Sequence, residues 1–396
     1  MTEKGYSISR MRILHVVTAF PRGPDDPITP WLVELLQRLR AAGHDVEVFT
    51  SAYKGSPDQT FAGIPVHRFR YFLRRWENLT HEETAPDRMR RSVLYRILPL
   101  FFIAAGMRAI RRLVRRHPYD VIHVHWPVPL ALFGWAAQRG GTPPIVTTFY
   151  GAELRLGFRR FIAWVARRSA RVIAISSYTA AVLREIVDVP IEVIPYAAAL
   201  PSATSSPRQS SGGATVLFVG RLVERKGVAH LIEALAQLED QRRTQLVVVG
   251  EGPERARLEA RARELGLTDR VVFRGRISDA ELRRAYESAD VFVLPAVLDS
   301  RGDTEGLGVV LLEAMNYGVP VIASRVGGIV DIVVDGETGV LVPAGDATAL
   351  ANALRKVLAD PARSRQLGEA GRRRLAEQFG WDAILARFEA VYRSVR

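Results

Sequence analysis

Short apolar runs alternate with polar, periodic segments along the whole chain. The first run, Arg12–Val17, is rich in β-branched residues and is followed by a loop of Pro, Gly and Asp. Thr29 and Pro30 then have the residue types of a helix N-cap and first helical position, and Gly43 has that of a helix end. A second β-branched run, Val46–Phe49, completes a strand–helix–strand unit, which predicts a parallel sheet.

The same alternation continues to the end of the chain. Four further strands are expected in the first half, at Val121–Val124, Ile145–Thr148, Val172–Ile175 and Glu192–Ile194. Five are expected in the second half, at Val216–Val219, Leu246–Val249, Val271–Phe273, Val291–Leu294 and Val321–Ala323. Helices are expected near Val228–Leu238, Glu254–Leu265, Asp279–Ser288, Val309–Tyr317 and Asp382–Val395. The fold class predicted is α/β, with a doubly wound sheet in each half.

One segment between the halves is rich in Ser, Pro and Gly, as linkers are. The domains expected are residues 1–197, a linker at 198–214, and residues 215–378. The last helix, within 379–396, is expected to pack back toward the first domain. Ligands bind at the carboxyl ends of strands in such sheets, so two facing domains would place the ligand in a cleft between them.

Composition narrows the functional classes. The length of 396 residues suits two domains, and 48% hydrophobic with 24% charged residues is typical of a globular protein. The sequence has no cysteine, which excludes disulfides, thiolate metal sites and cysteine nucleophiles. The polar segment Met1–Arg10 lacks the apolar core of a signal peptide, so a cytoplasmic location is expected.

The net charge of +13 is unevenly distributed. Residues 1–200 hold 28 Lys and Arg against 16 Asp and Glu, whereas the remainder is nearly balanced. The stretch Arg68–Arg116 holds 13 Arg and 4 acids, with aromatic residues between them. This mixture predicts contact with an anionic membrane surface, and a solvated basic helix face is the alternative. Val93–Ala105 is apolar, but it carries Arg96 and is too short to cross a bilayer.

The segment Glu305–Glu313 carries the strongest chemical signal. It reads E-G-L-G-V-V-L-L-E and opens a helix, with a turn made of Gly306, Leu307 and Gly308. Backbone N–H groups at such a helix start bind anions, which suits a diphosphate. Carboxylates accept hydrogen bonds from hydroxyl pairs, so the two flanking glutamates suit a sugar and a ribose. Either glutamate alone would be an ordinary loop or surface acid.

Here the chain resembles family 4 of the retaining glycosyltransferases, whose fold is called GT-B. The segment Glu305–Glu313 matches that family's E-x7-E motif. Four other segments match family signatures, namely Phe218–Leu222 with Lys226 and Gly227, Val248–Pro253, Asp290–Pro295, and Gly327 with Gly328. The resemblance covers nearly the whole chain. It implies transfer of a hexose from a nucleotide-diphosphate sugar to an acceptor hydroxyl with an α-linkage, without a metal.

The resemblance also implies roles for residues of the second half. Arg221 and Lys226, beside Gly220, would stabilise the leaving diphosphate, because two cations near a strand end can neutralise it. Glu305 would hold the donor sugar and Glu313 the ribose. The nucleotide would lie against Glu251, Arg276 and Ile277. For the cations, a solvated basic turn is the alternative.

The first half departs from the family pattern. The segment His123–Pro127 follows a strand, and in related enzymes a histidine at the position of His125 approaches the donor sugar; a structural histidine is the alternative. Thr147–Glu153 resembles the family's T-x-H-G-x-D segment, with Tyr150 in place of its histidine and Glu153 in place of its aspartate. Together with Thr29, these two residues are expected to contact the acceptor.

The sequence does not identify the acceptor, and a lipid-linked or cell-envelope glycan fits the basic stretch. A GT-B sugar-nucleotide epimerase would share the architecture. A basic module that binds nucleic acid or membrane would explain the charge but not the glutamate pair, and the sequence shows no nucleic-acid recognition motif. No Asp-x-Asp metal signature stands in a suitable place.

Overall fold

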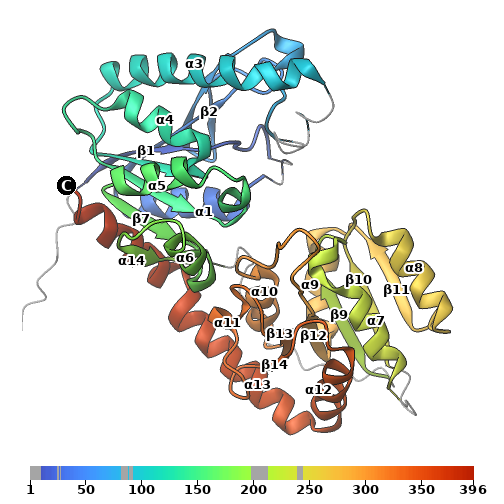
Figure 1. Ribbon diagram of the computed structural model, residues 1–396. Helices are drawn as coiled ribbons and strands as arrows, with labels where there is room; N and C mark the ends of the chain where they lie inside the picture. Colours follow the sequence, from blue (N-terminus) through green and yellow to red (C-terminus); the bar gives the residue numbers. More distant parts are fainter. Residues whose placement is uncertain are drawn as a thin grey trace, which may run out of the picture. The chain divides into compact units, whose positions relative to one another are not determined.

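The computed structural model describes residues 10–24, 26, 28–81, 88, 92–197, 213–238 and 244–396. It divides into two compact units (Figure 1). The first contains the chain up to Ile175, with Thr179–Ile194 and Ile384–Arg396, and the second contains Ser176–Tyr178 and Pro195–Ala383. The last residues of the chain therefore group with the first unit. Most of the expected linker, residues 198–212, lies outside the described residues.

The first unit is built on an eight-stranded sheet in the order β3-β4-β2-β1-β5-β6-β7-β8. Its strands are β1 (Arg12–Val16), β2 (Asp45–Ser51), β3 (Gln59–Phe61), β4 (Ile64–Phe69), β5 (Val121–His125), β6 (Ile145–Phe149), β7 (Arg171–Ala174) and β8 (Ile191–Val193). All pairs are parallel except β3 with β4. The six strands predicted here are confirmed. The hairpin of β3 and β4 was not expected, because polar residues such as His67 interrupt its short apolar pattern.

The helices of this unit are α1 (Pro30–Ala41), α3 (Val93–Arg116), α4 (Pro127–Ala137), α5 (Arg159–Arg168) and α6 (Ser177–Arg184). Leu98, Phe102, Gly106 and Ile110 recur at every fourth position of α3 and are buried. Residues at this spacing share one helix face. Phe102 packs there against Phe69 of the sheet and Phe133 of α4. Figure 1 shows α3 and α4 together on one side of the sheet.

Helix α1 starts differently from the expectation. Pro30 does occupy the first turn, but the side chain of Thr29 makes no capping hydrogen bond. Thr29 instead adopts a left-handed conformation with φ of 48°. A β-branched residue rarely adopts this conformation, so the turn before α1 is strained. The predicted N-cap position and the proline after it are therefore confirmed, but the side chain of Thr29 does not cap the helix.

The second unit has a six-stranded parallel sheet in the order β11-β10-β9-β12-β13-β14. Its strands are β9 (Thr215–Val219), β10 (Gln245–Val249), β11 (Val271–Gly275), β12 (Val291–Leu294), β13 (Val321–Ser324) and β14 (Val340–Val342). The helices are α7 (Val228–Ala236), α8 (Arg255–Glu264), α9 (Asp279–Ser288), α10 (Val309–Asn316), α11 (Ile329–Ile332), α12 (Ala347–Ala359) and α13 (Pro361–Arg374). The last helix, α14 (Trp381–Arg393), begins in this unit, and from Ile384 onward it belongs to the first. The five predicted strands are confirmed, and β14 was not expected.

Both sheets contain a point at which the strand order reverses. In the second unit it lies between β9 and β12, and in the first between β1 and β5. Helices on either side of such a point leave the strand ends open, so ligands bind beside them. The loops that follow these four strands are therefore where the candidate residues should gather.

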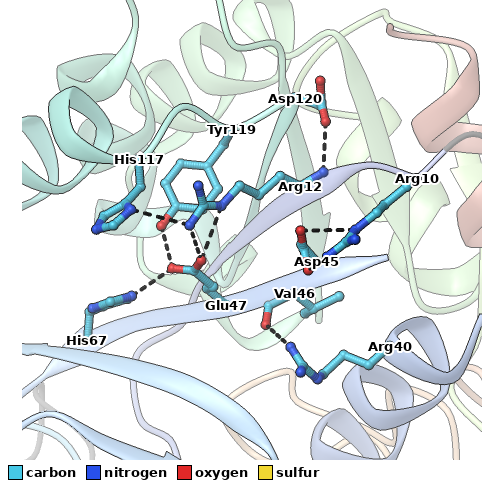
Figure 2. A network of polar contacts seen from close by, with 10 residues as sticks. All are labelled: Arg10, Arg12, Arg40, Asp45, Val46, Glu47, His67, His117, Tyr119 and Asp120. Atoms are coloured by element: carbon cyan, nitrogen blue, oxygen red, sulfur yellow. Dashed lines mark hydrogen bonds and ion pairs between the residues drawn. The ribbon is translucent and has the colours of Figure 1, made fainter. Parts of the chain in front are cut away.

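A network of ion pairs and hydrogen bonds around the buried Glu47 lies at the amino ends of the strands of the first sheet (Figure 2). Glu47 of β2 accepts hydrogen bonds from Arg12 at 2.6 Å, Tyr119 at 2.7 Å and His67 at 2.7 Å. Burial opposes ionisation of this carboxyl, but the hydrogen bonds outweigh burial and lower the pKa of Glu47 to about 2. Because Arg12 is the first residue of β1, the network lies at the amino ends of the strands and joins them there.

Gly227 fixes the turn after β9 through its lack of a side chain. Its φ is 66°, and a Cβ there would lie 1.8 Å from the carbonyl oxygen of Pro295. We expect Gly227→Ala to lower the free energy of unfolding by about 2 kcal/mol or more beyond the cost of the left-handed conformation itself. Chemical denaturation measures the change. Gly266→Ala is the control, since Gly266 has φ of 67° and no atom within 4 Å of such a Cβ. Equal effects would show that the close approach is unimportant.

Candidate functional site

In the second unit, the loops after β9, β10 and β11 form one connected rim. Gly220 N–H donates to the carbonyl of Val249 at 2.9 Å, and Leu222 N–H donates to that of Glu251 at 2.9 Å. Gly250 N–H in turn donates to the carbonyl of Gly275 at 2.8 Å. These backbone bonds hold three consecutive loops in register at the carboxyl edge of the sheet. The backbone positions of these loops are therefore fixed relative to one another.

Two cations from the loop after β9 converge on Glu305, which lies in the loop after β12. The Lys226 Nζ lies 2.5 Å from Glu305 Oε2, and Arg225 donates to the same oxygen at 3.0 Å. Burial of the carboxyl is the largest influence and opposes its ionisation, but Lys226 and Arg225 outweigh it and lower the pKa of Glu305. The carboxylate is thus ionised, and two positive charges lie directly beside it.

Arg221 lies on the same loop but differs in exposure. It follows Gly220 at the end of β9 and is exposed, whereas Lys226 is buried. Its guanidinium can therefore rotate toward a ligand without leaving a core contact. Lys226, in contrast, is held by the short turn Glu224–Lys226 and by Glu305. The structure thus combines one fixed and one adjustable cation at the switch point.

Glu313 lies in the second turn of α10, and its Oε2 accepts a hydrogen bond from the Tyr286 hydroxyl of α9 at 2.7 Å. Burial raises the pKa of this carboxyl, and the hydrogen bond from Tyr286 and the charge of Lys226 offset only part of the effect. A half-buried carboxyl with a hydroxyl donor on one oxygen can bind further hydroxyl groups at its remaining lone pairs. This geometry is compatible with the expected ribose contact.

The turn that starts α10 depends on Gly308, which occupies the N-cap position with φ of 94°. Gly328 N–H donates to the carbonyl of Glu305 at 2.9 Å and fixes the backbone in front of this turn. Leu307 is 1% exposed, so its side chain belongs to the core and only its backbone can face a ligand. The expectation that Leu307 lines the donor site is therefore restricted to its main chain.

The residues predicted to surround the nucleotide lie on the loops after β10 and β11. Glu251 forms an ion pair with Arg255, at the start of α8. Arg276 is exposed and Ile277 half-buried, directly after β11. A Cβ at Gly275 would lie 2.7 Å from Glu251 Oε1, so the two loops touch through these residues. The structure thus brings the three predicted residues to adjacent loops.

In the first unit, aromatic residues gather where β1, β5 and β6 end. The rings of Trp126 and Tyr150 stack with centroids 4.2 Å apart, and the ring of Trp31 lies 5.5 Å from that of Tyr150. Trp126 has φ of 50°, the same strained conformation as Thr29. The Thr29 Oγ1 is buried without a hydrogen-bond partner among the described residues. Strained residues cluster at binding sites, where the surrounding structure compensates for their cost.

His125 ends β5 and connects this aromatic cluster to the core. It is completely buried, and its Nδ1 lies 2.7 Å from the Tyr150 hydroxyl. Burial is the main reason why the pKa of His125 is well below its ordinary value, so the ring is neutral. A neutral imidazole in this position can orient the phenol, but it does not supply a positive charge.

Glu153 is buried beneath the same segment. Its Oε1 accepts a hydrogen bond from the backbone N–H of Tyr150 at 2.7 Å, whereas its Oε2 has no partner among the described residues. Burial raises the pKa of Glu153 to about 7, although the backbone hydrogen bonds partly oppose this. With 4% of its surface exposed, Glu153 supports the Tyr150 loop more directly than it can contact an acceptor.

Three residues at these sites were not anticipated. Arg225 is one of three consecutive charged residues in a turn, and the sequence pattern does not distinguish it from its neighbours. Tyr286 resembles any aromatic residue on the buried face of an amphipathic helix. His15 lies inside a short apolar strand, and only the pairing of β1 with β5 brings it beside His123.

Family models match both halves of the chain. The model described as Glycosyltransferase Family 4 matches residues 30–197, and the model described as Glycosyl transferases group 1 matches residues 204–374. Together the two matches include nearly all of the candidate residues named above.

Curated relatives and solved structures agree with these matches. The GDP-mannose-dependent alpha-(1-6)-phosphatidylinositol monomannoside mannosyltransferase of Mycolicibacterium smegmatis is 34% identical over 72% of this chain and 78% of its own. The 2-deoxystreptamine glucosyltransferase of Streptomyces kanamyceticus is 33% identical over 70% of this chain and 78% of its own. Sucrose-phosphate synthase from Thermosynechococcus elongatus superimposes with a TM-score of 0.74 and 26% identity, covering 96% of this chain and 98% of that one.

The raised pKa of Glu153 predicts a specific dependence of stability on pH. Between its ordinary pKa of 4.5 and about 7, the unfolded chain loses this proton while the folded chain keeps it. The free energy of unfolding therefore falls over this interval as pH rises. We expect Glu153→Gln to remove that fall and to stabilise the protein by up to about 3 kcal/mol at pH 8, with little effect below pH ~4.

Denaturant titrations at several pH values measure this difference. The exposed Glu185→Gln is the matched control, and it should leave the pH dependence unchanged. A Glu153→Gln variant that is less stable than the parent at pH 8 would contradict the prediction.

Proposed function

Because this chain belongs to the family 4 glycosyltransferases of the GT-B fold and uses a nucleotide-sugar donor, we propose that the site around Lys226 and Glu305 binds the donor's diphosphate and sugar. One observation carries the proposal. Two cations meet a buried carboxylate at the point where the strand order of the second sheet reverses. That is the charge arrangement needed to hold an anionic group next to a hydroxyl-rich one.

In the proposed reaction, the bond between the anomeric carbon and the diphosphate oxygen breaks while the acceptor oxygen bonds to the same face of the sugar. The acceptor hydroxyl passes its proton to the departing phosphate oxygen. Arg221, Arg225 and Lys226 stabilise the negative charge that develops on the diphosphate. Glu305 holds a sugar hydroxyl and Glu313 the ribose, while His125 shapes the region that receives the sugar. Three side-chain cations supply the positive charge, so we propose that transfer requires no metal.

We further propose that the acceptor is a lipid-linked hydroxyl at an anionic membrane surface. Val93, Ile97, Leu100 and Phe101 lie on the face of α3 opposite its buried residues, and Leu100 is 68% exposed. Arg108, Arg111 and Arg115 continue that face toward the end of the helix and are exposed. Arginines beside an apolar stripe attract anionic headgroups while the stripe enters the interface. The relative from Mycolicibacterium smegmatis, a phosphatidylinositol monomannoside mannosyltransferase, supports this acceptor class.

Helix α3 is longer than the apolar segment expected from the sequence. It has 24 residues, and by length and composition it meets the minimum for a membrane span. Its buried face, however, packs into the same core as Phe69 and Phe133. A helix with one face in the core and one face exposed suits an orientation parallel to the membrane surface. We therefore propose peripheral binding to the inner face of the membrane.

The donor prediction is tested by thermal shift and turnover. We expect a nucleotide-diphosphate hexose to raise the melting temperature, with GDP-mannose tested first and UDP-glucose second. Arg221→Ala should lower turnover by about 10²–10³-fold, because it removes one cation from the leaving group. The exposed Arg263→Ala on α8 is the control. Three outcomes would each contradict the mechanism, namely full turnover by Arg221→Ala, a β-linked product, or loss of activity with a chelator. Release of an isomerised sugar nucleotide without an acceptor would favour an epimerase.

The membrane prediction is tested by sedimentation with vesicles that contain phosphatidylserine or phosphatidylinositol. We expect binding at low salt that weakens as salt rises, since the arginines act through screened charges. Leu100→Glu should reduce the affinity about tenfold or more by placing a charge on the apolar stripe. Leu298→Glu, at a residue of the second unit that is 60% exposed, is the matched control. Equal binding by the two variants would exclude α3 as the contact surface.

A further inference from the structure

Three buried histidines share one face of the first sheet. His15 of β1 is paired in register with His123 of β5, and His125 follows two residues later, so the side chains point the same way. All three are 0% exposed. Leu14 and Val124 point to the other face, into the core beneath α3 and α4. The proposed function uses only His125, which leaves the other two without an assigned role.

Nearly every ring nitrogen of these histidines has a partner. His123 places its Nδ1 2.7 Å from the Tyr392 hydroxyl and its Nε2 2.7 Å from the Thr148 hydroxyl. His125 places its Nε2 3.0 Å from His15 Nδ1 and its Nδ1 2.7 Å from the Tyr150 hydroxyl. The remaining nitrogen, His15 Nε2, is buried and has no hydrogen-bond partner among the described residues.

The three rings are neutral, so each carries one N–H. Burial lowers the pKa of His15 to about 3. Burial and the neighbouring histidines lower the pKa values of His123 and His125 well below the ordinary range. In a neutral imidazole one nitrogen donates and the other accepts. The hydrogen bond between His15 and His125 therefore has only two possible directions.

The unpartnered nitrogen decides between these directions. If His125 donated to His15, then His15 would carry its hydrogen on Nε2, as a buried N–H without an acceptor. If His15 donates from Nδ1, its Nε2 is a lone pair instead. Buried N–H groups without a partner are rarer in proteins than acceptors without one. The second direction also puts the hydrogen of His125 on Nδ1, where it can be donated to the Tyr150 oxygen.

We propose that His15 is a positioning residue, which fixes the Nδ1–H tautomer of His125 and thereby makes the Tyr150 phenol accept from His125 and donate its own hydrogen onward. This inference rests on the proposed function, because it assigns the onward donation to a hydroxyl of the acceptor. The stacked ring of Trp126 and the nearby ring of Trp31 limit the rotation of the phenol. Tyr150 replaces the histidine of the family pattern, so the relay belongs to this chain's version of the segment.

A metal ion is the competing explanation for three clustered histidines. One ligand atom from each lies within 4.8 Å of the others. Both nitrogens of His123 and of His125 already lie at hydrogen-bond distance from a partner, however. An ion bound to all three rings would have to break at least two of these contacts. The geometry therefore favours a hydrogen-bond relay.

The test begins with a measurement that needs no activity. Long-range ¹H–¹⁵N correlation spectra of the full chain with ¹⁵N-labelled histidine report the tautomer of each ring, and His125→Gln identifies the signals of His125. We expect His125 as the Nδ1–H tautomer in the parent protein. An Nε2–H tautomer, or a bound metal ion detected in stoichiometric amount by elemental analysis, would overturn the proposal.

Two substitutions at His15 then separate positioning from packing. His15→Asn keeps an amide N–H near the place of Nδ1, whereas His15→Leu fills the space without a donor. We expect His15→Leu to mix the His125 tautomers and to raise the KM for the acceptor about tenfold, as for one lost hydrogen bond, with a smaller change in kcat. His15→Asn should restore both readouts. Equal defects in the two variants, or a normal His15→Leu enzyme, would overturn the proposal.

Tyr150→Phe completes a double-mutant cycle. If the relay acts through the phenol, His15→Leu should add little further loss in the Tyr150→Phe background, and fully additive losses would contradict the relay. The spectra keep the two proposals distinguishable. The expected tautomer in a protein without transferase activity would reject the proposed function alone, and the opposite tautomer in an active enzyme would reject the relay alone.

Discussion

The ion pair between Lys226 and Glu305 connects the two loops on which the proposed donor site depends. Lys226 follows β9 and Glu305 follows β12, so the pair spans the point at which the strand order reverses. The loops that follow parallel strands lie at one end of the sheet, which brings these two residues, about eighty positions apart, together. Each partner would be costly to bury alone, and together they place paired charges three residues before Gly308, the N-cap of α10.

The same topology has a different consequence in the first sheet. Central parallel strands are covered on both faces, so polar residues in them must find partners within the core. The histidines of β1 and β5 do so by bonding to one another and to hydroxyl groups, including that of Tyr392 from the last helix. The far end of the chain is therefore part of the interior of the first unit. All ring nitrogens of this network except His15 Nε2 have a partner among the described residues, so the network restricts the arrangement of these side chains.

Helix α3 packs one face into the core of the first unit and exposes an apolar face on the opposite side. Leu98 and Phe102 belong to the core, while Val93 and Leu100 on the opposite face are exposed. A soluble surface helix usually exposes polar residues in such positions. The retained apolar face has a cost in water that contact with a membrane would remove. Several arginines of the basic first half therefore lie on α3 beside this exposed apolar face, a position that composition alone could not show.

The sequence by itself determined the fold class and nearly all of the central strands, and it singled out the residues proposed for the donor site. Those signals are local, since β-branched runs mark strands and glycines before a helix mark an anion site. The sequence could not determine that Arg225 joins Lys226 on Glu305, that Tyr286 donates to Glu313, or that His15 lies against His125.

Tertiary structure decided these contacts because each joins residues from different elements, whose proximity depends on strand order and not on spacing along the chain. It also left Thr29 at the N-cap position without a capping hydrogen bond and restricted Leu307 to its backbone. In both cases residue type suggested a role, and the direction in which the folded backbone points the side chain decided the outcome.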